Sequence, residues 1–131
     1  MSTGASILIA DDDPDILLLL SVHFERAGYE VLPARTGSDA LQLATERLPA
    51  VAVLDVTMPG LDGFEVTRSL RANLATRSMP VILLTARAQA TDFAQGMAAG
   101  ADEYVKKPFD AGDLIDRVER LLQPRLAANE G

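Results

Sequence analysis

Short apolar runs alternate along the chain with stretches whose apolar residues recur at helical spacing. Each run lies between polar or turn residues and has the length of a buried strand rather than that of a helix. The predicted strands are Ser6–Ala10, Tyr29–Ala34, Ala50–Leu54, Val81–Leu84 and Glu103–Val105. The third run is apolar throughout, which is typical of a central parallel strand that is buried on both faces.

A helix is predicted after each strand, because apolar residues there fall three and four positions apart and capping residues precede several of the segments. The predicted helices cover residues 14–27, 37–48, 63–73, 90–99 and 111–122. Pro124 is expected to end the last helix, since proline lacks the N–H that a helix interior needs. In the first helix, the stripe expected to face the core consists of Ile16, Leu19, Leu20, His23 and Phe24.

Strand and helix thus alternate five times, which predicts an α/β fold with a parallel sheet and helices on both of its faces. In such folds, functional groups gather beyond the carboxyl ends of the strands. The chain has 131 residues, the size of one domain, and its 48% hydrophobic content excludes disorder along the whole length.

Composition narrows the possible chemistry. Cysteine is absent and His23 is the single histidine, which excludes disulfide scaffolds, thiolate zinc sites and multi-histidine metal sites. The net charge of −7 argues against nucleic-acid binding by this domain alone, because phosphate contacts need clustered basic residues. The sequence has neither an apolar run long enough to span a membrane nor a secretory signal pattern, so no membrane contact and a cytoplasmic location are expected.

Polar residues stand at the carboxyl ends of the predicted strands. The acids Asp11, Asp12 and Asp13 follow the first strand, and Asp55 follows the third. A hydroxyl and two ammonium groups follow the fourth and fifth strands, in Thr85-Ala86 and Lys106-Lys107. Clustered carboxylates suit Mg²⁺, and a carboxylate can also attack phosphorus to form an aspartyl-phosphate. Asp55 is the best candidate nucleophile, since it stands alone at the end of the central strand.

These residues lie in four motifs, ILIADDDPD, VAVLDVTMPGLDGFEV, VILLTA and GADEYVKKPF. In this order and spacing, the motifs resemble the receiver domain of bacterial two-component response regulators. The resemblance implies a flavodoxin-like, doubly wound (βα)5 fold with strand order 2-1-3-4-5. It divides the chain into an N-terminal tail (residues 1–5), a receiver domain (6–122) and a C-terminal tail or start of a linker (123–131).

The resemblance also implies roles for individual residues. Asp55 is the implied phosphoacceptor, and Asp11 and Asp12 form the acidic pair that holds Mg²⁺, for which Mn²⁺ can substitute. Asp12 and Asp55 are expected to ligate the metal directly, joined by the backbone carbonyl of Thr57. The implied phosphate-binding and switch residues are Thr85, Ala86, Tyr104 and Lys107, with a cis peptide bond before Pro108.

The implied function is that of a phosphoacceptor switch and not of an enzyme, beyond self-phosphorylation from a donor and autodephosphorylation. A sensor histidine kinase or a histidine phosphotransfer protein is the expected donor, and an output domain or protein is the expected recipient of the signal. Thr85 is expected to move toward the phosphoryl group and Tyr104 to turn into the vacated space, which changes the face formed by the fourth helix, fifth strand and fifth helix. Thr57 and Arg87 are expected to set the lifetime of the phosphoprotein.

The alternative function is a phosphatase of the haloacid dehalogenase type, in which Asp11 would be the nucleophile. Asp11 and Asp13 satisfy its D-x-D pattern, but Asp15 stands where that motif has Thr or Val. The chain is either a free-standing receiver or part of a longer regulator, and both readings stay open.

Two further expectations concern surfaces. Leu17 and Leu18 lie off the predicted stripe of the first helix, so they are expected to contact a partner, unless Leu17 packs against a neighbouring helix. Glu103 and Arg117 can form a charged pair across a dimer of the face that contains the fifth strand and helix.

Overall fold

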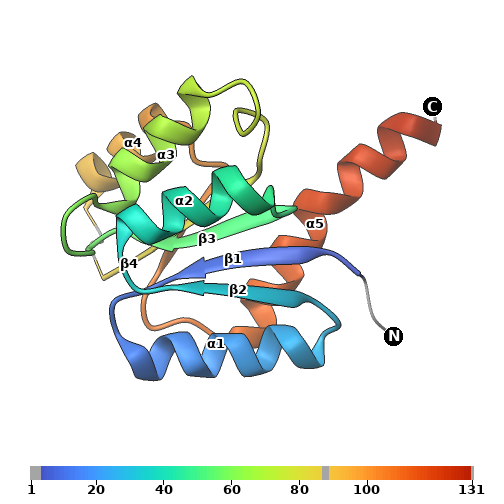
Figure 1. Cartoon of the computed structure of the whole chain (residues 1–131), viewed down its shortest axis with the longest axis horizontal. Coiled ribbons are helices and arrows are strands. Elements are labelled where there is room, and N and C mark those ends of the chain that lie inside the picture. Colours follow the sequence, from blue (N-terminus) through green and yellow to red (C-terminus); the bar gives the residue numbers. More distant parts are fainter. Residues whose placement is uncertain (1–3, 87–88, 131) are drawn as a thin grey trace.

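Parallel strands and helices alternate through the whole computed structural model, which describes residues 4–86 and 89–130, the last seven as backbone only. Figure 1 shows the sheet with helices above and below it. The strands are β1 (Ser6–Ala10), β2 (Glu30–Ala34), β3 (Val51–Asp55), β4 (Val81–Thr85) and β5 (Glu103–Lys106). The helices are α1 (Pro14–Arg26), α2 (Gly37–Arg47), α3 (Gly63–Ala72), α4 (Ala90–Ala99) and α5 (Ala111–Glu130).

The five strands form one sheet in the order β2-β1-β3-β4-β5, with every neighbouring pair parallel. The predicted fold class and strand order are therefore confirmed. Strand order reverses between β1 and β3, and in sheets of this kind a crevice opens there beyond the carboxyl ends of the strands. Among the described residues, none of the helices combines the length and the apolar character that a membrane span requires.

The core has two halves, one on each face of the sheet. Along β3, Val51 and Val53 face the half that α1 and α5 cover, whereas Ala52 and Leu54 face the half that α2, α3 and α4 cover. Figure 1 shows the same division, with α2, α3 and α4 on one side of the strands and α1 on the other. Successive strand side chains point to opposite faces, so a central strand covered on both sides must be apolar at every position.

Helix starts follow the capping residues. Asp13 accepts the backbone N–H groups of Asp15 and Ile16 at 2.9 and 3.4 Å, and Asp62 exchanges two hydrogen bonds with Glu65 in a complete capping box. The Thr36 hydroxyl likewise accepts a backbone N–H in the first turn of α2. Each cap satisfies an N–H that the first helical turn leaves without a partner.

One prediction for α1 was wrong. The helix buries Leu17, Leu20 and Phe24, while Leu19, expected in the core, is 51% exposed. Five consecutive apolar residues place apolar groups all around this helix, so the sequence pattern does not choose a face. The packing of α1 against β2 and α5 makes that choice. Leu18 is 65% exposed, as expected. Leu17 is buried, which is the alternative that the sequence left open for it.

The predicted end of α5 was also wrong. The helix continues through Pro124 to Glu130, and its last turns extend beyond the sheet in Figure 1. A proline removes one backbone hydrogen bond and bends a helix, but it does not have to end one. The following residues RLAANE are mostly strong helix formers, which favours continuation.

Candidate functional site

Four strands bring polar side chains to one edge of the sheet. Asp11 directly follows β1, Asp55 is the last residue of β3, Thr85 is the last residue of β4, and Lys107 directly follows β5. Asp55 pairs with Leu84 in the sheet register, so the ends of β3 and β4 lie side by side. Parallel strands end at a common edge, which is why residues far apart in sequence meet here.

Lys107 is the centre of the charged contacts at this edge. Its Nζ lies 3.0 Å from Oδ2 of Asp11 and 3.3 Å from Oδ1 of Asp55. Asp11 is fully buried, and its Oδ1 accepts the backbone N–H of Asp13 at 2.9 Å. Both oxygens of Asp11 are therefore engaged, and this carboxylate is held in a fixed orientation.

Three carboxylates converge beside that ammonium group. Asp11, Asp12 and Asp55 each place an oxygen within 4.8 Å of the others; Asp12 is exposed and the other two are buried. Asp13 belongs to the helix cap and stands apart from this group. Three carboxylates against one ammonium group leave two uncompensated negative charges, which matches a divalent cation with oxygen ligands such as Mg²⁺.

The pKa of Asp55 reflects this crowding. Burial, followed by the charge of Asp11, raises it from 3.8 to about 6, although Lys107 acts in the opposite direction. Burial by itself would lower the pKa of Lys107, but its hydrogen bond and charge interactions with Asp11 and Asp55 outweigh that effect and raise it. Asp55 is therefore ionised at neutral pH but destabilised, as expected of a carboxylate that gains by binding a cation.

The other candidate residues differ in how far they are exposed to solvent. Thr85 is buried, whereas Ala86 and Thr57 are exposed. The peptide bond between Lys107 and Pro108 is cis. Arg87 lies outside the described residues, so its predicted effect on phosphoryl lifetime stays a prediction.

Tyr104 lies on β5, and its half-buried ring packs against α4. The ring stands edge-on to Phe93, with the centroids 5.8 Å apart. An added Cβ on Gly96 would lie 2.8 Å from the Tyr104 ring, so the glycine makes room for it. The aromatic side chain thus connects β5 to α4 in this structure.

Sequence reasoning missed an apolar groove beside Lys107. It has a volume of about 420 Å³ and is lined by Ile16, Leu19, Ala86, Lys107, Pro108 and Phe109. Leu19 belongs to it because α1 turns that residue away from the core. The excess of leucines in the first helix was the available signal, since one helix face cannot bury all of them.

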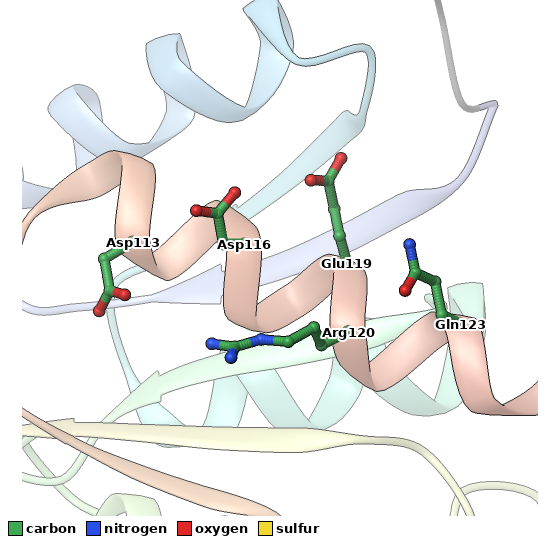
Figure 2. A pocket seen from close by; sticks show the side chains of 5 residues that line it. All are labelled: Asp113, Asp116, Glu119, Arg120 and Gln123. Carbon is green, nitrogen blue, oxygen red and sulfur yellow. The ribbon is translucent and has the colours of Figure 1, made fainter.

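Two other surface features do not belong to the cluster. Arg117 contacts both Glu103 and Asp113 within the chain, at 2.6 and 3.0 Å, so the pair expected across a dimer is already formed inside one molecule. A polar hollow of about 410 Å³ runs along α5 (Figure 2), lined by Asp113, Asp116, Glu119, Arg120 and Gln123. These side chains come from one helix and splay in different directions in Figure 2 rather than converging on a point.

Comparison with protein families gives a match over most of the chain. The family model of the response regulator receiver domain matches residues 7–119. Among curated proteins, the DNA-binding dual master transcriptional regulator RpaA of Synechocystis is 44% identical over 117 residues, which cover 89% of this chain and 48% of RpaA. The chain spans about half the length of the transcriptional regulators that it matches.

Solved structures agree with the family match. The chemotaxis response regulator CheY4 of Vibrio cholerae is 32% identical with a TM-score of 0.86, over 92% of this chain and all of CheY4. The receiver domain of the sensor histidine kinase PA1611 from Pseudomonas aeruginosa is 30% identical with a TM-score of 0.85, over 92% of this chain and 99% of that domain. That structure has a magnesium ion coordinated in its active-site cleft.

Proposed function

Because the chain belongs to the family of response regulator receiver domains, we propose that Asp55 accepts a phosphoryl group and that the domain relays this event as a conformational signal. One observation carries the assignment. Asp55 stands within 4.8 Å of two further carboxylates, Asp11 and Asp12, and 3.3 Å from the ammonium group of Lys107. A nucleophile, a cation site and a positive charge for the phosphoryl oxygens thus occupy one crevice.

The chemistry assigned to the chain's own residues is simple. A carboxylate oxygen of Asp55 forms a bond to phosphorus while the bond from phosphorus to the donor nitrogen breaks, and the donor leaves with that electron pair. Lys107 offsets the negative charge on the phosphoryl oxygens. Asp12, Asp55 and the carbonyl of Thr57 would ligate Mg²⁺, and the buried Asp11 adds negative charge beside them. When bound, the ion neutralises further charge on the phosphoryl group. Although its pKa is raised to about 6, Asp55 is still ionised, and therefore nucleophilic, at neutral pH.

The signal follows from added charge. A phosphoryl group brings roughly −1.5 to −2 charges next to existing carboxylates. We expect the buried hydroxyl of Thr85 to turn toward it, and the Tyr104 ring, packed on α4 beside Phe93, to follow. The face of α4, β5 and α5 then changes, and a partner that prefers the changed face raises its population. Exposed Thr57 stands next to the site in sequence and is expected to affect how fast water reaches the phosphoryl group.

The donor is expected to dock in the apolar groove beside Lys107. A phosphohistidine must approach Asp55 closely, and this groove is an apolar surface that adjoins the charged cluster through Lys107. Leu19 and Phe109 would contact a helix of a histidine kinase or phosphotransfer protein. Leu19→Ala should slow transfer from such a donor and leave phosphorylation by a small phosphodonor unchanged; equal slowing with both would contradict the docking role.

The output is expected to be a separate domain or protein. RpaA, whose name describes a DNA-binding transcriptional regulator, is about twice as long as the region matched here. With a net charge of −7, this domain is not expected to bind nucleic acid by itself, and a cytoplasmic location fits a phosphorelay partner.

The phosphatase alternative receives no support from the fold or the comparisons. Its nucleophile, Asp11, is fully buried, with Lys107 on one oxygen and the N–H of Asp13 on the other. A nucleophile needs an accessible oxygen, and Asp11 lacks one in this arrangement.

The decisive experiment is phosphorylation by a small phosphodonor with Mg²⁺, followed by intact mass measurement. One phosphoryl group should be added to the wild-type chain and none to Asp55→Asn. Phosphorylation of Asp55→Asn would overturn the assignment. If Asp11→Asn lost phosphorylation while Asp55→Asn kept it, the phosphatase would be favoured. Asp12→Asn should weaken Mg²⁺ binding more than the matched control Asp13→Asn, since Asp13 serves as the helix cap.

A further inference from the structure

Helix α2 contacts the loop that follows Asp55 through a glycine. Gly37 is the first residue of α2 and is buried against Leu61. A Cβ built on Gly37 would overlap the carbonyl oxygen of Leu61 and lie 2.7 Å from its Cβ and 2.8 Å from its carbonyl carbon. The obstacle is mainly main chain, which cannot swing aside as a flexible side chain can. Gly37 does not have a positive φ, so it is needed here for the close approach alone.

The loop between Asp55 and α3 is held at its other points as well. Its two ends meet where the N–H of Gly63 donates to the carbonyl of Val56 at 2.8 Å. Met58 is 6% exposed and belongs to the core half beneath α2, α3 and α4. The side chain of Leu61 packs against the same half of the core. The turn at Gly60 has a φ of 76°, and a Cβ built there would meet no atom within 4 Å, so neighbouring groups do not confine it in the same way.

This loop also contains Thr57, whose backbone carbonyl is proposed above as a metal ligand. A carbonyl ligand is positioned by its backbone, so whatever fixes the loop fixes the ligand. Three residues, Met58, Pro59 and Gly60, separate Thr57 from Leu61, and Pro59 has a restricted φ. A displacement of Leu61 is therefore passed on to the Thr57 carbonyl through only a short stretch of backbone.

We propose that Gly37 is a positioning residue for the metal site: by lacking a side chain, it lets α2 brace Leu61 and so holds the Asp55–α3 loop, with the Thr57 carbonyl, in the geometry that binds Mg²⁺. The inference rests on the proposed function. It adds a residue from a different helix, which touches neither the metal nor the phosphoryl group and acts through the loop.

The test compares Mg²⁺ affinity of the unphosphorylated full chain by isothermal titration calorimetry. Gly37→Ala should bind Mg²⁺ about tenfold more weakly, the size of effect seen when outer-shell support of a metal ligand is removed. The matched control is Thr36→Ala, which removes the adjacent cap of the same helix, an N–H bond of 3.1 Å, and does not push on Leu61. Its stability should fall while its Mg²⁺ affinity stays at the wild-type value.

A kinetic readout separates positioning from general damage. With a small phosphodonor, the Mg²⁺ concentration needed for half-maximal phosphorylation should rise about tenfold in Gly37→Ala, while the rate at saturating Mg²⁺ is preserved. If Gly37→Ala does not fold, Leu61→Ala removes the side chain that anchors the brace without adding bulk, and it should show the same loss of affinity.

Three results would overturn the inference. One is an unchanged affinity in Gly37→Ala, which would mean that the Gly60 turn absorbs the displacement. Another is an equal loss in Thr36→Ala, because affinity would then follow stability. The third is an unchanged affinity in Leu61→Ala where Gly37→Ala does not fold. If the wild-type chain itself binds no Mg²⁺, the proposed function fails, which is a different result from failure of the brace.

Discussion

Replacing Asp55 by Asn should stabilise the metal-free protein. In the folded chain, burial and the charge of Asp11 raise the pKa of Asp55 from 3.8 to about 6. Above pH 6 the wild type therefore folds with a carboxylate that is more costly in the folded than in the unfolded state. Asn has a similar shape and no charge, so Asp55→Asn removes this cost.

The magnitude follows from the pKa. A rise from 3.8 to about 6 corresponds to about 3 kcal/mol at pH values well above 6. Solvent access and side-chain relaxation at the edge of the sheet reduce this figure, so we expect about 2 kcal/mol. For a domain of this size, that is a rise in Tm of roughly 6–10 °C at about pH 7.5 without metal.

The pH dependence of stability separately checks that Asp55→Asn stabilises the protein. Between about pH 4 and 6, folded Asp55 holds a proton that the unfolded chain has lost, so wild-type stability falls as pH rises through this window. The advantage of Asp55→Asn should therefore vanish near pH 4 and be complete by about pH 7.5. Mg²⁺ should reduce it at neutral pH, since the metal stabilises the wild type by binding its folded state.

The assay is thermal and urea unfolding across pH, with and without Mg²⁺. Asp13→Asn is the matched control, because it removes the same charge from an exposed position and keeps a good N-cap. An Asp55→Asn variant that is no more stable than wild type at neutral pH, or a gain equal to that of Asp13→Asn, would refute the reasoning.

Three other changes have defined outcomes. Lys107→Met should raise the pKa of Asp55 further, because Lys107 lowers it; NMR titration of the carboxyl carbon would show this, and an unmoved pKa would contradict the contact. Arg71→Met should cost about 2–3 kcal/mol in urea unfolding, since Arg71 donates to three backbone carbonyls and to Asp102; Arg71→Lys should not restore it. Phe24→Ala should lower the free energy of unfolding by about 3–5 kcal/mol, measured by the same method, because its ring is fully buried. A smaller loss would mean that neighbouring side chains fill the cavity left by the ring.

Local patterns in the sequence were enough to predict the elements of the fold. An apolar run such as that at residues 51–54 becomes a central strand because it is buried on both faces, and the caps Asp13 and Asp62 mark helix starts because they satisfy neighbouring N–H groups. These effects act over a few residues, so they can be read from the chain directly. The positions of Asp11 and Asp55 at strand ends follow from the same patterns.

Ambiguous local signals gave the wrong results. The leucine run of α1 has apolar groups on every side, and packing against β2 and α5 decided that Leu17 is buried and Leu19 exposed. Pro124 lowers helix propensity at one position only, and its neighbours outweighed it. In both cases the outcome depends on a free energy summed over many residues, so it cannot be predicted from one position in the sequence.

The sequence by itself determined which groups stand at the carboxyl ends of the strands, because strand order along the chain and the parallel sheet leave them no other edge. Only the tertiary structure decided how those groups engage one another. The contact between Lys107 and Asp11 joins residues 96 positions apart, and the seat of Leu61 on Gly37 joins two separate helix–strand units. Such contacts depend on the angles at which helices and strands pack, to within fractions of an ångström, and those angles are set by the close-packed core as a whole.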